Sequence, residues 1–259
     1  MRKDLQFLQQ AVIHVRQTKI QLKLYQAYKR YAKKRELKFL EQYQTLFPVN
    51  NHPGCLLLQK EKKKKEKAKS NRRSTDIAVP LEDDSDEVED ALESSEETFW
   101  WEKVFSKHTN MGDVVNGNKI VLLIKILVLA DRVNDKVVVF SQNLHTLDFI
   151  EKVLQRSDWS EHVPGLKNLS PDKTMGNRKK NMEYLRIDGS TSSKERGDLI
   201  DKFNEKKKMK SLEEEAKVFL ISSMAGCVGI NLVGANRVII FDSSWNPTVD
   251  LQAVYRCYR

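Results

Sequence analysis

The C-terminal end of the chain carries the residues with the clearest chemical potential. Gln252, Arg256 and Arg259 are spaced at i, i+4 and i+7, so on a helix they lie within about 60° of one another. A guanidinium offers planar, permanently charged, bidentate donors, which suit the charge on a transferring phosphoryl group. Such an arginine, supplied across an interface, accelerates the reaction by roughly 10³ to 10⁵. A surface arginine pair has the same spacing, so the pattern alone leaves both interpretations open.

The helix that carries these residues has a recognisable start and a second, apolar stripe. Asn246 is a good N-cap, and Pro247 suits the first helical position. Four apolar residues repeat the spacing one position earlier, about 100° away around the helix. We expect this stripe to pack on a sheet, and it consists of Leu251, Val254, Tyr255 and Tyr258.

Upstream of this helix, apolar strands alternate with helical patterns. The predicted strands are continuous in Val, Ile, Leu and Phe, and they cover residues 137–140, 184–187, 218–221 and 238–241. Helical spacing is found at 119–132, 144–154 and 193–204, and residues 156–181 are predicted to form an insertion or long loop. This alternation predicts an α/β fold, with a parallel sheet covered by helices on both faces.

Small, polar or glycine residues follow each predicted strand. Ligands of open parallel sheets collect beyond the carboxyl ends of the strands, so four such exits together predict a ligand-facing edge, which we call the rim. Its residues are Ser141 and Gln142; Asp188, Gly189, Ser190 and Thr191; 222–231; and 242–246.

Two parts of the rim have candidate phosphate-binding features. Gly226 and Gly229 let backbone amides approach a phosphate closely, although a plain tight turn has the same pattern. Ser192 and Glu195 form a capping-box pattern, and Lys194 and Arg196 lie in or beside the first turn of that helix. These cations and the helix-end amides suit a DNA phosphate, and a solvated helix face is the equally good alternative.

The N-terminal part has a different texture. Residues 1 to about 47 are predicted to be helical, and Pro48 with the Asn50-Asn51 pair is expected to end the helix. Residues 59–97 are basic first and acidic afterwards, with few large apolar side chains, which predicts disorder. The acidic part, 82–97, suits either histone-tail binding or simple solubilisation. The predicted division is a helical segment at 1–58, a charged linker at 59–98 and an α/β lobe at 99–259.

Composition limits the possible partners. The net charge is +9 with 40% apolar residues, which fits a core-forming protein with a polyanionic partner, although the run Lys60–Lys69 supplies most of the excess and resembles a solvated linker. No signal peptide is evident at the N-terminus. The most apolar run, Ile120–Ala130, is short and contains a lysine, which indicates a buried helix and no membrane span.

Cysteine usage predicts neither a disulfide framework nor a metal site. Cys55, Cys227 and Cys257 are odd in number and far apart, which favours a reducing compartment. His52 lies three residues before Cys55, but no second pair completes a zinc site.

Five segments in order carry a resemblance to a known family. They are Lys-Val-Val-Val-Phe-Ser-Gln at 136–142, Arg-Ile-Asp-Gly-Ser-Thr at 186–191, Ser-Ser-Met-Ala-Gly-Cys-Val-Gly-Ile-Asn-Leu at 222–232, Val-Ile-Ile-Phe-Asp-Ser-Ser-Trp-Asn-Pro at 238–247 and Gln-Ala-Val-Tyr-Arg-Cys-Tyr-Arg at 252–259. Together they resemble motifs IV to VI of SWI/SNF-like superfamily-two helicases, and Asp-x-x-Trp-Asn-Pro is a marker of that branch. Leu24-Tyr-Gln and His52-Pro-Gly-Cys also resemble its ATRX-like members.

The resemblance implies a RecA-like second lobe of a double-stranded-DNA translocase that uses ATP and Mg²⁺ and acts on nucleosomes and histones in the nucleus. By this similarity, Arg256 and Arg259 match arginine fingers, with Gln252 beside them. Gly226, Gly229 and Asn231 then line a cleft between lobes near ATP. The residues near the tracked DNA strand are Ser141, Gln142, Asp188, Gly189, Ser190 and Thr191.

Several features depart from the family pattern. Met224 stands where Lys or Arg is usual, Cys227 where Gly or Ser is usual, and Gly54 where an aromatic residue is expected. No Gly-x-x-x-x-Gly-Lys-[Ser/Thr] phosphate loop occurs. We therefore expect ATP and Mg²⁺ to be bound mainly by a missing N-terminal ATPase lobe, this sequence to stop within motif VI, and the chain alone to be inactive.

The sequence has two alternative interpretations beside this enzyme lobe. A non-catalytic module that binds DNA or histones and retains the lobe fold stays open on the sequence. An RNA-helicase lobe is disfavoured, because the last motif lacks the His-Arg-x-Gly-Arg-x-Gly-Arg pattern of that group.

Overall fold

The computed structural model describes residues 8–75, 99–105, 110–156, 159–166, 178, 180–205, 215–226 and 230–258. Four parallel strands form its sheet, in the order β2-β3-β1-β4. The strands are β1 (Val137–Ser141), β2 (Tyr184–Ile187), β3 (Val218–Ser222) and β4 (Arg237–Ile240). Each predicted strand is found within one residue, because a continuous β-branched or aromatic run suits a strand buried on both faces.

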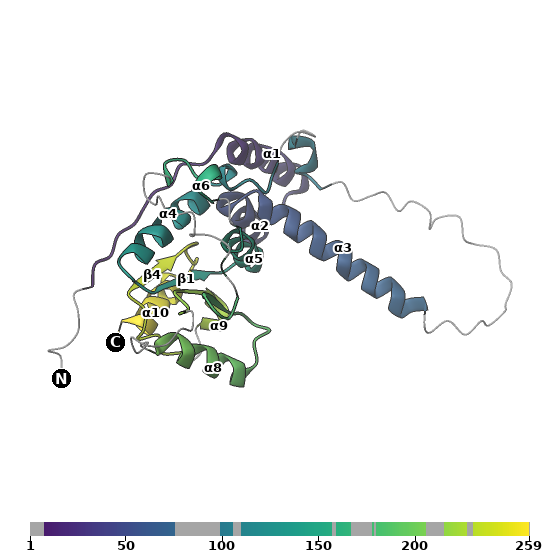
Figure 1. Cartoon of the computed structure of the whole chain (residues 1–259). Coiled ribbons are helices and arrows are strands. Elements are labelled where there is room, and N and C mark those ends of the chain that lie inside the picture. The colour runs from purple at the N-terminus through teal and green to yellow at the C-terminus, as the bar shows by residue number, and fades with distance from the viewer. Residues whose placement is uncertain are drawn as a thin grey trace, which may run out of the picture.

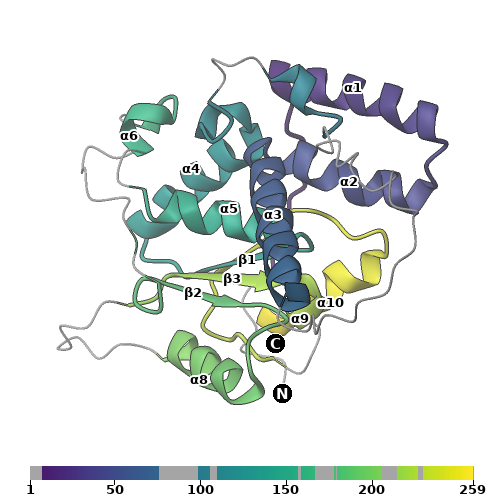
Figure 2. The same cartoon turned by 90° about the vertical axis from the view of Figure 1, so that its right-hand side faces the viewer.

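Helices cover both faces of this sheet, as predicted (Figure 2). On one face, α4 (Asn118–Arg132) and α5 (Leu144–Leu154) pack against β1 residues such as Val137 and Val139. On the other face, α8 (Ser193–Asn204), the short α9 (Ser223–Gly226) and α10 (Pro247–Cys257) pack against Val138 and Phe140. The alternation of β1 side chains between two apolar clusters confirms the α/β architecture expected of a RecA-like lobe.

The predicted apolar run in 120–130 forms most of α4, which buries one side in the core. Ile120, Ile124 and Val128 are each 1% exposed or less. No helix within the described ranges combines the length and apolarity that crossing a bilayer requires.

The N-terminal region is an extended segment and two helices, so the prediction that residues 1 to about 47 are helical is wrong for 8–18 and confirmed for most of 19–47. Residues 8–18 are not helical, α1 spans Lys19–Arg35 and α2 spans Phe39–Asn51. The Ala-Val-Ile-His-Val run at 11–15 favours extended backbone, and Thr18 starts α1 with a complete capping box. Glu36, with φ of 50°, ends it. Pro48 lies inside the last turns of α2 and does not stop the helix.

Part of the predicted disordered linker is helical. The helix α3 runs over Gly54–Thr75 and projects from the body of the molecule (Figure 1). Its first turn is anchored by the buried Cys55 and Leu56, and the Lys, Glu and Gln residues that follow are good helix formers. The expectation of disorder therefore fails for 59–75, while 76–98, including the acidic run 82–97, lies outside the described residues.

The predicted loop at 156–181 also contributes to the core. The one-turn helix α6 (Trp159–His162) buries Trp159, whose indole N–H donates to the Val153 carbonyl at 2.6 Å. Two short 3-10 turns, η1 (Glu102–Val104) and η2 (Val114–Asn116), complete the described elements.

Candidate functional site

The rim begins with a carboxylate that joins two neighbouring strands. Asp242, which is 3% exposed, follows β4 and accepts hydrogen bonds from the Ser141 hydroxyl at 2.6 Å and the Gln142 N–H at 2.7 Å. These contacts form because β1 and β4 are adjacent and parallel. Ser141 is fully buried, so its hydroxyl supports the rim from beneath, whereas Gln142 is half-buried at its surface.

A buried amide from α2 extends this network. Asn51 donates to the Asp242 carboxylate at 2.8 Å and to the Thr146 hydroxyl at 2.9 Å. The Lys119 ammonium donates to the Asn51 side-chain oxygen at 3.0 Å and to the Phe241 carbonyl at 3.2 Å. The N-terminal helices are thereby hydrogen-bonded to the centre of the lobe.

Burial shifts both charged groups of this network toward their neutral forms. Burial raises the pKa of Asp242 above its ordinary value, against the hydrogen bonds from Ser141, Gln142 and Asn51 and the charge of Lys119. Burial likewise lowers the pKa of Lys119, against the attraction of Asp242. Their donors and acceptors are used inside the protein, so this cluster positions the rim.

The exit of β2 is a rigid turn with an open tip. Asp188 accepts from the Ser190 N–H at 2.9 Å and hydroxyl at 2.6 Å, and its own N–H donates to the Thr191 hydroxyl at 3.1 Å. Burial raises the pKa of Asp188, but the bonds from Ser190 and the charge of Arg186 outweigh it and hold the pKa below its ordinary value. Gly189 and Ser190 are exposed at its tip. The turn is separated from Gln142 by β3.

The two cations of α8 have different environments. The Ser192 hydroxyl accepts from the Glu195 N–H at 3.3 Å, which starts the helix as predicted. Lys194 is exposed. Arg196 is half-buried and donates to the carbonyls of Ala225 at 3.4 Å and Thr191 at 3.5 Å. Arg196 thus ties α8 to α9 and the β2 turn, and Lys194 is the cation that faces solvent.

The glycine turn is partly described. Gly226 ends α9, Gly229 lies outside the described residues, and Asn231 is exposed. The Asn231 carbonyl accepts from the Asn204 amide at 2.8 Å, which fixes the far end of the turn to α8.

The arginine-bearing helix begins as predicted and packs differently. The Asn246 side chain accepts from the Thr248 N–H at 3.0 Å, and Pro247 is the first helical residue. The face that meets the core carries Ala253 and Cys257. The expectation that the apolar stripe packs on the sheet is wrong for Leu251 and Tyr255, which are 48% and 55% exposed. Small side chains at 253 and 257 allow the helix to approach the sheet closely and turn that stripe outward.

The candidate arginine fingers are placed in part. Gln252 is exposed and Arg256 is half-buried, one turn apart on α10, while Arg259 lies outside the described residues. The Arg256 carbonyl accepts from the Leu232 N–H at 2.9 Å, so the end of the helix is tied to the segment after the glycine turn. The helix contacts α9 and β4, and α9 lies where the β3 arrow points in Figure 2.

Contacts from α2 to the rim could not be found from local sequence patterns. The Tyr43 hydroxyl donates to the Ser243 carbonyl at 3.2 Å. The exposed Trp245 ring lies 5.1 Å from Phe39 and 6.0 Å from Tyr43 between centroids. Together with the bond from Asn51 to Asp242, these contacts join α2 to Asp242, Ser243 and Trp245, in the segment that leads into α10. These partners are about 200 positions apart, as in the separation of 200 for Tyr43 and Ser243.

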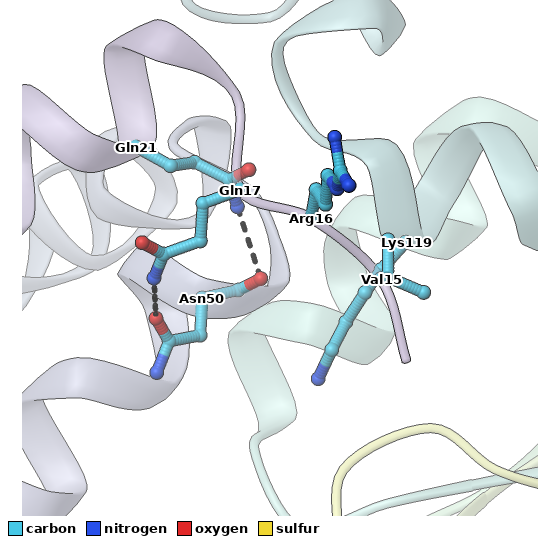
Figure 3. Close-up of a pocket in the computed structure, with 6 residues that line it drawn as sticks. All are labelled: Val15, Arg16, Gln17, Gln21, Asn50 and Lys119. Carbon is cyan, nitrogen blue, oxygen red and sulfur yellow. Dashed lines mark hydrogen bonds between the residues drawn. The ribbon is translucent and has the colours of Figure 1, made fainter. Parts of the chain in front are cut away.

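A cavity of about 270 Å³ lies where the extended N-terminal segment meets α1, α2 and α4 (Figure 3). The Gln17 amide donates to the Asn50 side chain at 2.7 Å, and the Gln21 amide donates to the Asn50 carbonyl at 2.9 Å. Arg16 and Lys119 point away from these amides in different directions. The Gln17 and Gln21 amides are thus both paired with Asn50, and the cavity is a joint between elements.

Fold and rim together define a parallel α/β lobe with polar and glycine residues at the carboxyl edge of its sheet. Residues 118–259 match the helicase conserved C-terminal domain family. This match covers more than half of the chain, so the chain belongs to that family, and its relatives are of the SWI2/SNF2 type.

Similar proteins include a chromatin-remodelling protein, a transcriptional regulator and a helicase. The chain is 37% identical over 238 residues to Protein CHROMATIN REMODELING 20 of Arabidopsis thaliana, covering 85% of this chain and 15% of the relative. It is 41% identical over 159 residues to Transcriptional regulator ATRX of Mus musculus, covering 61% and 6%. It is 40% identical over 162 residues to Helicase ARIP4 of Mus musculus, covering 62% and 10%. The chain thus spans between 6% and 15% of these relatives.

Two solved structures are also similar. The C-terminal part of the Fun30 ATPase domain is 34% identical, with a TM-score of 0.41, covering 59% of this chain and 39% of that chain. The Sulfolobus solfataricus SWI2/SNF2 ATPase core domain is 25% identical, with a TM-score of 0.37, covering 57% and 25%.

Proposed function

We propose that this chain is the C-terminal lobe of an ATP-dependent translocase on double-stranded DNA that remodels chromatin. The observation that carries the proposal is the position of α10. It holds Gln252 and Arg256 one turn apart and packs against α9, whose last residue opens the glycine turn. A guanidinium beside backbone amides suits the charge of a phosphoryl group in transfer.

In this proposal the arginines act on a nucleotide bound mainly by another lobe. Arg256 and Arg259 stabilise the transferring phosphate, Gln252 orients it, and Gly226, Gly229 and Asn231 line the cleft. These neutral and cationic donors fit a triphosphate. They do not fit Mg²⁺, and no group of three metal-ligating side chains occurs among the described residues. We assign the metal and most ATP contacts to a separate N-terminal ATPase lobe. That lobe would supply the hydrolytic step once ATP and Mg²⁺ are bound.

DNA contacts are assigned to the exposed parts of the rim. We assign contacts with phosphates of the tracked strand to Gly189 and Lys194, which are exposed, whereas the Ser190 donors are directed to Asp188 and the side-chain nitrogen of Gln142 is buried. Ser141, Asp188, Thr191 and Arg196 hold these groups in position through the bonds described above. Nucleosomes and histones are the proposed larger partners, and the nucleus the proposed location, by similarity to the relatives.

Hydrolysis of ATP tests this assignment. The 259-residue chain and a longer protein that adds the phosphate-loop lobe are compared with and without duplex DNA. We expect no hydrolysis by the chain alone and DNA-stimulated hydrolysis by the longer protein. A longer protein that hydrolyses ATP at the same rate without DNA would contradict the translocase assignment.

A second candidate function is a non-catalytic module that binds DNA or histones. Met224 favours it, because this side chain is 78% exposed on α9 where related lobes have a cation. This candidate predicts steeply salt-dependent DNA binding and no hydrolysis even in the longer protein.

A further inference from the structure

The exposed face of α1 is cationic without an acidic residue to balance it. Within Lys19–Arg35 there are seven Lys and Arg residues and no Asp or Glu. Like charges four positions apart on a helix repel and destabilise it, and Lys19 with Lys23, and Arg30 with Lys34, are such pairs. The positive charges on this surface therefore repel one another, and no acidic residue within the helix reduces that repulsion.

Four of these cations form one row. Lys19, Lys23, Arg30 and Lys34 fall within about 60° around the helix and extend over about 22 Å along its axis. All four are exposed. The row lies about 150° from the buried side, which consists of Gln21, Leu24, Tyr28 and Ala32. We call these four residues the α1 row.

The α1 row has no internal partner among the described residues. Lys29 and Arg35, outside the row, lie over the rings of Tyr25 and Tyr31 at 6.0 Å and 5.3 Å. No ion pair or hydrogen bond joins a side chain of the row to any other residue in the described ranges. In Figure 2, α1 is an outer helix, with α2 between it and the sheet.

We propose that the α1 row binds the phosphate backbone of duplex DNA, at a contact separate from the rim. Duplex DNA carries one charge per about 1.7 Å of its axis, so a straight cationic row of this length faces several phosphates at once. Flexible lysine and arginine side chains bind phosphates without reading sequence. The proposal rests on the DNA substrate of the proposed function and adds a second place where the duplex is held.

The structure also connects this contact to the rim. Gln21, on the buried side of α1, donates to the carbonyl of Val49 in α2 at 2.9 Å. Thr18, the cap of α1, donates to the Asn116 carbonyl at 2.9 Å. The helix α2 ends at Asn51, whose amide donates to Asp242 at the rim. DNA held on α1 therefore has a fixed position relative to the rim.

Salt-dependent binding tests the proposal with a charge-matched control. Lys23→Gln/Arg30→Gln/Lys34→Gln removes three charges from the α1 row, and Lys62→Gln/Lys64→Gln/Lys65→Gln removes three exposed charges from α3. Binding of the 259-residue chain to a fluorescein-labelled duplex is measured by anisotropy between about 50 and 200 mM salt. Circular dichroism checks that each variant is folded.

We expect the α1 variant to bind roughly tenfold more weakly or worse, with a log Kd against log salt slope reduced by about 2 to 3, because each lost phosphate contact removes about 0.9. The α3 variant should change the slope by less than about 1, and Lys23→Arg/Lys34→Arg should bind like the parent chain. Equal losses in both triple variants would show a net-charge effect and overturn the proposal. An α1 variant that binds DNA like the parent but loses binding to poly-glutamate would also overturn the proposal, and would indicate an acidic protein partner. Failure of the hydrolysis test alone leaves this binding result unaffected and concerns the proposed function only.

Discussion

At the scale of single residues, Asn51 has more influence on the rim than its sequence position suggests. Its amide donates to both Asp242 and Thr146, and its oxygen accepts from Lys119. The side chain is fully buried, so it supplies each of these groups with one hydrogen bond in the interior, beside those that Asp242 and Lys119 make elsewhere. An acceptor left unpaired in the interior costs about 1–3 kcal/mol.

Replacing this amide should therefore destabilise the lobe. We expect Asn51→Ala to lower the free energy of unfolding by about 2–4 kcal/mol, because the Asp242 carboxylate and the Lys119 ammonium each lose a partner. Urea denaturation measures the change. Gln44→Ala, which removes an exposed amide from the same helix, is the control and should change stability by less than about 0.5 kcal/mol. Equal effects of the two substitutions would contradict the role given to Asn51.

The rim shows how far residue types could predict the site. Ser141, Gln142 and the 188–191 turn follow buried strands, and this pattern was enough to place them at one edge of the sheet. The division between supporting and exposed groups was not predictable, because it depends on distant partners. Arg196 bonds to the Ala225 carbonyl, for example, and nothing near residue 196 in the sequence specifies that acceptor.

At the scale of elements, the strands and the helices that cover them were predictable from Asn118 onward. In the N-terminal region helix was predicted, but the non-helical residues 8–18 and the break between α1 and α2 were not. Continuous β-branched runs have one good solution in a two-sided sheet. The lysine-rich α3 contradicts the expectation of disorder, because its residues have high helix propensity. The exposed stripe of α10 contradicts the expectation that it packs on the sheet, because the small residues Ala253 and Cys257 face the core instead. Gly54 has a specific reason for its departure from the aromatic pattern: an added Cβ would lie 2.4 Å from the Phe149 ring, which fills that space.

His52 joins three elements and should make stability depend on pH. Its ring stacks on Phe149 of α5 with centroids 4.0 Å apart, accepts from the Gly54 N–H at 2.9 Å, and lies 3.0 Å from the Asp113 carbonyl. Burial lowers the pKa of His52 from 6.5 to about 4, against the hydrogen bonds to Asp113 and Val114. The folded state therefore keeps a neutral ring over a range in which the unfolded chain takes up a proton.

Stability should fall as pH drops below 6.5, since the unfolded state binds the additional proton. Between pH 7 and pH 5 we expect His52 to contribute a loss of about 2 kcal/mol. Urea denaturation at the two pH values, on the parent chain and on His52→Gln, isolates this contribution from those of the carboxylates. The variant should lose about 2 kcal/mol less than the parent over this interval, and parallel losses would show that the ring is protonated in the folded state.

At the scale of the whole molecule, contacts from distant parts of the chain hold α10 at the surface of the lobe. Asn246 caps the start of α10, and α2 contacts the segment that precedes it through Asn51, Tyr43 and Phe39. Contacts between residues about 200 positions apart are invisible to local patterns, so the sequence predicted the helix and not its support. The chain spans 6% to 15% of the length of the relatives named above. We place the lobe that binds the nucleotide in the rest of such a protein.

In the proposed function, the guanidiniums of Arg256 and Arg259 act on a nucleotide held by another lobe. Steady-state hydrolysis by the longer protein tests it most directly, with saturating duplex DNA and the variants Arg256→Ala, Arg259→Ala and Arg132→Ala. Arg132 is an exposed arginine at the end of α4 and provides the control. We expect kcat to fall by roughly 10³ or more in Arg256→Ala and in Arg259→Ala, with KM for ATP changed much less and Arg132→Ala like the parent. Full activity in both Arg256→Ala and Arg259→Ala would contradict the account.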